Sequence, residues 1–206
     1  MKLHLGCGTK RLPGWINIDS VKGVSPDVIH DLRKSFPYQD LSVEEILAED
    51  LLEHFDKYMR IQVFSEWSRV LQIGGKITIQ VPDLHKILFY RYFKFKFDDL
   101  VDQVFGENVL QGHVYIGDFG NHKWGYSQKS LTQFVGQFGI KPIGVKTIGL
   151  NIRFSGVKEF HVSAADVDRL IISSFNNKGG CFSSLSFAQV KSKIAEFYRN
   201  LEEADK

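Results

Sequence analysis

The sequence predicts an α/β fold with an open sheet, and two observations near its start support this prediction. First, Leu3 and Leu5 alternate with polar neighbours, as in a short buried strand, and Gly6-Cys7-Gly8 follows directly. Glycines at the carboxyl end of a first strand can take a positive φ and let a ligand approach the bare backbone. In open α/β sheets, nucleotides bind at this edge.

The second observation is an acidic residue at the end of the next predicted strand, Ile16–Asp19. A carboxylate at that point can accept hydrogen bonds from both hydroxyls of a ribose. In dinucleotide-binding Rossmann folds the acid lies about 20 residues past the glycines, after a full helix. Asp19 follows Gly8 by only eleven positions, and Pro13-Gly14 would stop a helix between them. A dehydrogenase is therefore disfavoured, and a turn residue at the strand end is the alternative interpretation of Asp19.

Length and composition are those of an ordinary globular protein. The chain has 206 residues, 43% of them hydrophobic, and a net charge of +2, so one main domain and no obligatory nucleic-acid or membrane partner are expected. Cys7 and Cys181 form neither a disulfide framework nor a metal-ligand spacing. No signal peptide or membrane-spanning run is recognisable, and we expect a cytoplasmic protein without a bound metal.

Two stretches carry a family resemblance: residues 3–8, Leu-His-Leu-Gly-Cys-Gly, and residues 14–19, Gly-Trp-Ile-Asn-Ile-Asp. Together they resemble the opening of class I S-adenosylmethionine-dependent methyltransferases, most closely a compact bacterial and phage branch linked to sugar or polysaccharide modification. The resemblance implies a Rossmann-like α/β fold whose seven-stranded, mostly parallel sheet has an antiparallel last strand. It also implies S-adenosylmethionine as cofactor, lying across Gly6 and Gly8 with its ribose on Asp19.

The next strands continue the resemblance. Val28–Leu32 reads as a third strand whose Asp31 would lie near the adenine, and Glu45–Ala48 reads as a fourth. Many relatives then have Ser-His-Xaa-Xaa-Glu-His-Phe; residues 53–55 match this pattern, whereas Glu-Asp at 49–50 replaces Ser-His. Alternatively, Glu53 and His54 are polar residues at the start of a helix, with a structural role only. The cofactor contacts implied by the resemblance are Leu5, Gly6, Cys7, Gly8, Asn17, Asp19, Asp31, Leu32, Asp50, Leu51, Glu53 and His54.

Apolar spacing predicts the later helices and strands. A helix over 57–72, capped by Asp56, would bury the stripe Met59, Val63, Trp67 and Val70, with Gly74-Gly75 near its end. A fifth strand would follow over 77–81. Ser127 would cap a helix that buries Leu131, Phe134, Val135 and Phe138. The ranges 140–148 and 158–162 read as the closing antiparallel hairpin.

The segment 84–126 is predicted to form a substrate-side helix and a lid loop. Rings and cations alternate over 85–97, a pattern also compatible with nucleic-acid bases or a membrane surface. Acidic residues follow at once and cancel most of this charge, which disfavours nucleic acid. We therefore expect a helix with Phe89, Phe93 and Phe97 packed inward.

The resemblance covers residues 1–164, which we expect to form the methyltransferase domain, and 165–206 would be a C-terminal helical appendage. A capping box at 186–189 begins a predicted helix of about 186–204. Apolar residues recur in this helix at three-four spacing, so one face of it is apolar. That face could pack on the protein's own surface in a monomer, or on a second copy of the chain in a homodimer.

The predicted reaction is transfer of a methyl group to an acceptor oxygen or nitrogen, and the resemblance alone favours O-methylation of a sugar or another small or glycan acceptor. His54, His113 and His122 are the candidate bases, because a neutral imidazole can take a proton near pH 7. His122 ranks first because Asn121, Trp124 and Tyr126 around it could hold a polar acceptor. A non-catalytic cofactor- or glycan-binding protein and a nucleic-acid methyltransferase are the alternative functions.

Overall fold

The computed structural model describes residues 1–90, 101, 104–106, 109–110, 114–115, 120–176 and 192. The chain divides into two compact units, Met1–Val162 and Ser163–Lys206. Within the described residues, no helix combines the length and the apolar character that crossing a bilayer requires.

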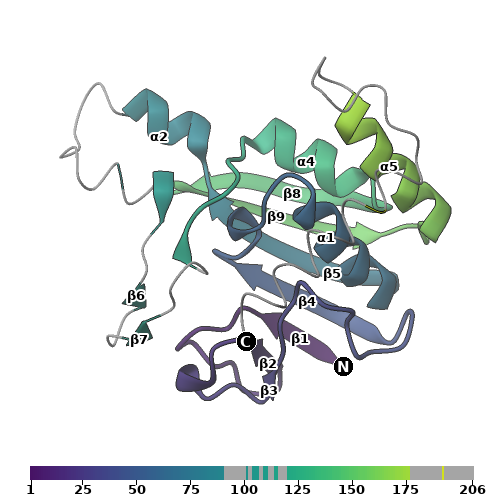
Figure 1. The fold of residues 1–206 in the computed structure, drawn as a ribbon, viewed down its shortest axis with the longest axis horizontal. Helices are drawn as coiled ribbons and strands as arrows, with labels where there is room; N and C mark the ends of the chain where they lie inside the picture. The colour runs from purple at the N-terminus through teal and green to yellow at the C-terminus, as the bar shows by residue number, and fades with distance from the viewer. Residues whose placement is uncertain are drawn as a thin grey trace. The chain divides into compact units, whose positions relative to one another are not determined.

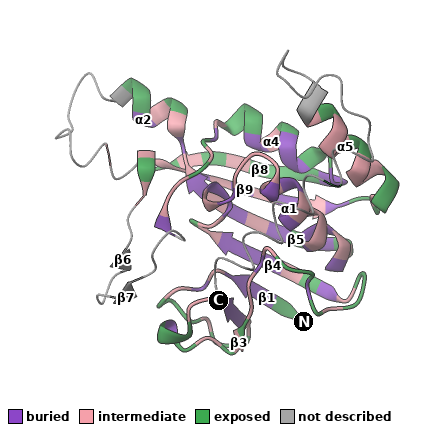
Figure 2. Ribbon diagram, viewed as in Figure 1, coloured by how far each residue is buried: buried purple, intermediate pink, exposed green. Residues whose placement is uncertain are grey.

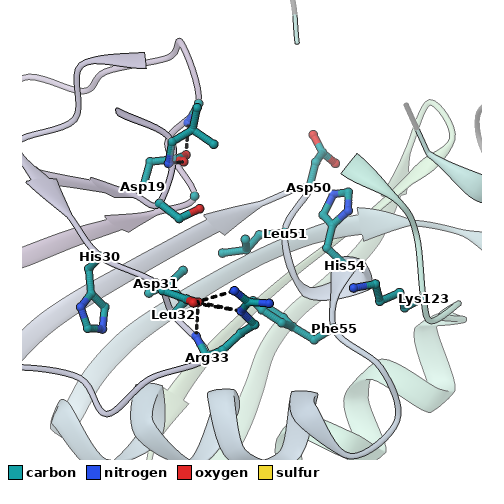
Figure 3. A pocket seen from close by; sticks show the side chains of 14 residues that line it. Asp19, His30, Asp31, Leu32, Arg33, Asp50, Leu51, His54, Phe55 and Lys123 are labelled. Carbon is teal, nitrogen blue, oxygen red and sulfur yellow. Dashed lines mark hydrogen bonds and ion pairs between the residues drawn. The ribbon is translucent and has the colours of Figure 1, made fainter. Parts of the chain in front are cut away.

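The first unit is built on a seven-stranded sheet (Figure 1). Its strands are β1 (Lys2–Leu5), β2 (Ile16–Asp19), β3 (Val28–Ile29), β4 (Val43–Glu49), β5 (Leu71–Pro82), β8 (Ile140–Ile148) and β9 (Asn151–Lys158). They lie in the order β3-β2-β1-β4-β5-β9-β8. The first five are parallel, and β9 runs antiparallel to both of its neighbours. The predicted fold class is thus confirmed, and the carboxyl ends of β1, β2 and β4 form the sheet edge shown in Figure 3.

Helices and a small second sheet complete the described part. The helices are η1 (Lys22–Val24), η2 (Leu52–His54), α1 (Met59–Val70), α2 (Leu84–Tyr90) and α4 (Gln128–Gly136), with α5 (Ala164–Asn176) in the second unit. Strands β6 (Val109–Leu110) and β7 (Val114–Tyr115) pair antiparallel. The helix predicted over 186–204 lies outside the described residues, apart from residue 192. Helix α5 is a further helix that the sequence analysis does not predict.

The core lies between the sheet and the apolar faces of α1 and α4 (Figure 2). All four residues of the predicted α1 stripe are buried, and so are the four predicted for α4 and the turn after it. The ring centroid of Phe64 lies 5.3 Å from that of Phe134 and 4.9 Å from that of Phe138, so the two helices pack on each other through aromatic contacts. Ser127 caps α4 by accepting a hydrogen bond from the backbone N–H of Ser130, as predicted.

The predicted helix over 57–72 is too long at both ends. Asp56 accepts hydrogen bonds from the N–H groups of Tyr58 and Met59, and α1 begins at Met59. The chain becomes extended at Leu71, and Gly74-Gly75 lies inside β5 instead of ending the helix. Leu71 pairs with Val43 of β4, and from Lys76 onward β5 is flanked by both β4 and β9, an arrangement that local spacing does not reveal.

Two further predictions are wrong in position. The last strand is Asn151–Lys158 and not 158–162, because the chain reverses within two residues at Gly149, whose φ is 59°, and Ile148 pairs with Asn151. Phe89 does not pack inward: it is 72% exposed, whereas Ile87 of α2 is buried. Phe93 and Phe97 lie outside the described residues.

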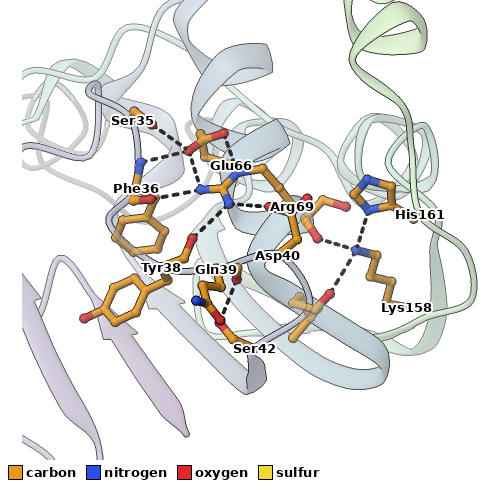
Figure 4. A network of polar contacts seen from close by, with 12 residues as sticks. Ser35, Phe36, Tyr38, Gln39, Asp40, Ser42, Glu66, Arg69, Lys158 and His161 are labelled. Atoms are coloured by element: carbon orange, nitrogen blue, oxygen red, sulfur yellow. Dashed lines mark hydrogen bonds and ion pairs between the residues drawn. The ribbon is translucent and has the colours of Figure 1, made fainter.

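A polar network joins α1 to the segment between β3 and β4 (Figure 4). The Arg69 guanidinium donates to both carboxylate oxygens of Glu66, to Asp40, and to the carbonyl oxygens of Phe36 and Tyr38, at 2.7–2.9 Å. Its planar fork of donors matches this set of oxygens, so one side chain holds the loop on the helix.

Close to this network, the buried side chain of Lys158 is 1% exposed and ends at the last turn of α1. Its Nζ donates to the carbonyl oxygens of Ser68 and Leu71. These carbonyls belong to the helix C-terminus, where a cation is favoured. Burial nevertheless lowers the pKa of Lys158 from its ordinary value of 10.5 to about 8.

The lowered pKa of Lys158 predicts a pH dependence of stability. Between pH of about 8 and 10.5 the unfolded chain keeps the proton that the folded protein has released, so the free energy of unfolding rises with pH in this window. In Lys158→Met this rise of the free energy of unfolding with pH should be absent. Urea unfolding of both proteins from pH 7.5 to 10.5 measures the difference, and parallel pH profiles would contradict the assignment.

Candidate functional site

A pocket opens at the carboxyl ends of β1, β2 and β4 (Figure 3). It is lined by Gly6, Gly8, Asp19, Ser20, Val21, His30, Asp31, Leu32, Arg33, Asp50, Leu51, His54, Phe55 and Lys123. Eight of these are among the twelve predicted cofactor contacts. In Figure 3, Asp19 and Asp31 lie on one side of the pocket, and Asp50, His54 and Lys123 lie on the other.

The turn after β1 requires its glycines. Gly6 and Gly8 have φ values of 60° and 51°, a region in which residues with a side chain are strained. A Cβ on Gly6 would also lie 2.7 Å from Cδ1 of Leu51. The sequence predicts a glycine at position 6 for the approach of a ligand, and the close packing of Leu51 is a second reason for it.

Asp19 holds this turn and also faces the pocket. One carboxylate oxygen accepts a hydrogen bond from the N–H of Gly8, and the other accepts one from the N–H of Val21, both at 2.9 Å. The residue is 9% exposed. Because each carboxylate oxygen has more than one acceptor site, Asp19 can still accept bonds from a ligand in the pocket.

Asp31 is paired within its own loop. Its carboxylate accepts hydrogen bonds from Nε and Nη2 of Arg33 and from the Arg33 backbone N–H, at 2.7–3.0 Å. Partial burial alone would raise the pKa of Asp31, but the hydrogen bonds and the charge of Arg33 outweigh it, and the pKa is lowered. Asp31 is therefore a carboxylate at neutral pH. Arg33 and His30 were not predicted as pocket residues; no local spacing marks them.

Four predicted cofactor residues do not line the pocket. Leu5 is fully buried in β1, and the buried thiol of Cys7 has its pKa raised to about 11 by burial. The buried amide of Asn17 accepts from the N–H of Leu12 and donates to Asp27, so it supports the loop from inside. Glu53, the fourth, lies behind the pocket beside the two histidines described next.

Two segments far apart in sequence meet at η2. The carbonyl oxygen of Glu53 accepts hydrogen bonds from the N–H groups of both Lys123 and Trp124, at 2.8 and 3.0 Å. The N–H of His122 donates to the carbonyl oxygen of Phe105 at 2.8 Å. These bonds fix the loop beside η2, so His122 and His54 come together: their ring centroids are 4.9 Å apart in an edge-to-face arrangement.

The polar groups of Glu53, His54 and His122 form a compact cluster. One atom from each, a carboxylate oxygen and two ring nitrogens, all lie within 4.8 Å of one another. Glu53 is 1% exposed, and burial together with the charge of Asp50 raises the pKa of its carboxyl well above the usual range. Burial and the neighbouring His122 lower the pKa of His54 to about 4. The third predicted base, His113, lies outside the described residues.

The aromatic residues after His122 have a structural role that was not predicted. Tyr126 is 1% exposed and is therefore a core residue instead of an acceptor contact. The guanidinium of Arg60 in α1 lies 4.2 Å from the ring centroid of Trp124 and 4.4 Å from that of Phe134. This cation–π stacking anchors the loop to both helices.

The chain is similar to known proteins in its structure and not detectably in its sequence. No family model matches the chain, and no curated protein matches it in sequence. The chain is similar to a protein of Pyrococcus horikoshii OT3, with 17% identity, a TM-score of 0.56, and 77% of this chain and 81% of that one covered. An S-adenosylmethionine-dependent methyltransferase of Methanosarcina mazei has 15% identity and a TM-score of 0.53, with 78% and 92% covered.

A third similar structure is the 1,6-didemethyltoxoflavin-N1-methyltransferase of Burkholderia thailandensis, in complex with 1,6-didemethyltoxoflavin and S-adenosylhomocysteine. It shares 12% identity and a TM-score of 0.51, over 77% of this chain and 71% of that one. The fold of the first unit is therefore the Rossmann-like class I methyltransferase fold. The resemblance to a sugar-modifying branch is not shown by these comparisons.

The packing of Gly6 predicts a stability difference between two glycine substitutions. Gly6→Ala introduces both the positive-φ strain and the contact with Leu51, whereas Gly14→Ala, at φ 78° with no atom within 4 Å, introduces the strain alone. The strain costs about 1–2 kcal/mol, and Gly6→Ala should lower the free energy of unfolding by more than Gly14→Ala does. Urea unfolding measures both, and an equal loss would contradict the role of Leu51.

Proposed function

We propose that this protein is an S-adenosylmethionine-dependent methyltransferase. The observation that carries the proposal is the pocket at the carboxyl ends of the parallel strands, where a positive-φ glycine turn and the Asp19 carboxylate face the same space. The shared fold supports it, and one of the similar structures contains bound S-adenosylhomocysteine together with 1,6-didemethyltoxoflavin.

The groups in the pocket fit this cofactor chemically. Asp19 offers acceptors for ribose hydroxyls, and the ionised Asp31 next to Leu32 offers an acceptor for an exocyclic amine and an apolar surface for a base. The bare backbone at Gly6 and Gly8 allows the amino-acid part of the cofactor to approach. On this assignment the reactive methyl group points toward the side of the pocket with Asp50, His54 and Lys123.

The reaction proposed is in-line displacement at the sulfonium by an acceptor oxygen, with a sugar hydroxyl preferred on the sequence resemblance. Because the cofactor carries a positively charged leaving group, the protein has to align the acceptor and remove one proton. His122 is the first candidate for that proton, since it lies beside the pocket residue His54. Mass spectrometry that detects a gain of one methylene on candidate glycans would identify the acceptor.

Asp19→Ala should weaken binding of S-adenosylmethionine at least about tenfold, because it removes two charge-assisted hydrogen bonds worth roughly 1.5–3 kcal/mol each where water does not compensate. Isothermal calorimetry measures this affinity. Asp27→Ala is the matched control, because it removes a carboxylate that also holds the loop through Asn17 but does not line the pocket. Unchanged affinity in Asp19→Ala would exclude the ribose assignment.

If His122 is the base, His122→Ala should lower kcat by about 10²–10⁴ and leave cofactor affinity nearly unchanged. Turnover is followed by transfer of a labelled methyl group to the acceptor found by mass spectrometry, and cofactor affinity by calorimetry. A variant with near-normal turnover would eliminate His122. A wild-type protein that binds the cofactor but methylates no acceptor would instead indicate a non-catalytic binding protein.

A further inference from the structure

We propose that Glu53, His54 and His122 form a binding site for a divalent first-row transition-metal ion beside the pocket. The three side chains come from η2 and from the loop that follows residue 120, and each offers one ligand atom to the same small volume. The sequence suggested no metal site, because the second histidine is 68 positions away from the first.

The Glu53 carboxylate is the first argument. Its side chain is 2% exposed, and neither oxygen has a hydrogen-bond partner among the described residues. A buried carboxylate without a partner is costly, and such groups are normally paired or bound to a metal. The imidazole of His122 is close, but its Nε2 lies 3.9 Å from Oε1 of Glu53, which is too long for a hydrogen bond. A metal ion in this position would supply the missing positive charge.

The hydrogen bonding of His54 is the second argument. Its Nδ1 lies 3.2 Å from the carbonyl oxygen of Asn121. Because a carbonyl oxygen only accepts, Nδ1 must carry the proton, and the lone pair of the neutral ring is then on Nε2. A metal-binding histidine usually donates one ring N–H to a backbone carbonyl and binds the ion through its other nitrogen.

The backbone holds the cluster in place. The carbonyl oxygen of Glu53 binds the N–H groups of residues 123 and 124, so the two segments are tied together by main-chain bonds next to the ligands. Ligand atoms around one such ion lie about 3.0–3.4 Å apart, given metal–ligand bonds of about 2.0–2.2 Å. Because the three atoms already lie within 4.8 Å of one another, their separations need to shorten by no more than about 2 Å to reach this spacing.

The ligand set indicates the kind of ion and its use. Two imidazoles and one carboxylate favour zinc, iron, cobalt or manganese over calcium or magnesium, which prefer oxygen ligands. Three protein ligands leave coordination positions open, as in catalytic sites. Because His54 also lines the pocket, the open side can face the acceptor. This role of the ion rests on the proposed function: the ion would polarise the acceptor hydroxyl and ease loss of its proton. With the ion bound, His122 would act in this step as a ligand, and its role as the base belongs to the metal-free protein.

The test uses the full chain, stripped with a chelator and titrated with Co²⁺ in the absence of cofactor and acceptor. Calorimetry measures stoichiometry and affinity, and the visible absorption of Co²⁺ reports coordination by the protein. We expect one ion per chain, bound at least about tenfold more weakly by Glu53→Gln and by His122→Gln. His85→Gln, which changes an exposed histidine of α2, is the matched control and should bind as the wild type does.

Thermal unfolding checks that each variant is folded. If Glu53→Gln, which changes a buried residue, does not fold, the comparison of the wild type with His122→Gln decides the test. Absence of Co²⁺ binding, or equal binding by wild type and His122→Gln, would overturn the site. Metal binding without S-adenosylmethionine binding would retain the site and refute the proposed function. Cofactor binding and turnover that persist unchanged after chelation would refute the role of the ion in the reaction.

Discussion

The carboxylate of Asp19 is the constraint on which the pocket depends. It ends β2, and its two oxygens accept the N–H groups of Gly8 and Val21, so it joins the turn after β1 to the start of the next loop. Gly8 lies beyond the end of β1, where its N–H has no neighbouring strand to bond to. Without the Asp19 carboxylate this N–H would need another hydrogen-bond partner. One side chain therefore sets the shape of the turn and presents its carboxylate to the pocket.

A second constraint acts on the opposite side of the pocket. The carbonyl oxygen of Glu53 receives two backbone N–H groups from the loop at 123–124, and Arg60 stacks on Trp124 to hold the same loop from α1. These contacts place a loop residue, His122, against η2. The side of the pocket with Asp19 is thus built from sequence neighbours after each strand, whereas the opposite side is assembled from two distant segments.

Features that depend on neighbouring residues in the sequence were predicted correctly, and features that depend on contacts between distant segments were not. The apolar stripes of α1 and α4 were correct because a helix that covers a sheet must bury residues at three-four spacing. The predicted boundary between α1 and β5 is wrong because Gly74-Gly75 has the local pattern of a helix end, whereas the pairing of Leu71 with Val43 of β4 extends the strand back to Leu71. Tyr126 was read as an acceptor contact, but tertiary packing buries it in the core.

By itself, the sequence determined the parallel half of the sheet and the pocket edge. A glycine turn after an apolar strand and an acid after the next one are local signals, and parallel strands bring such strand ends to the same edge. Only the tertiary structure decided that Leu51 packs on Gly6, that Asn17 supports the loop from inside, and that Glu53 and His54 meet His122. Those outcomes depend on contacts between residues far apart in the chain, whose burial and distance no local pattern encodes.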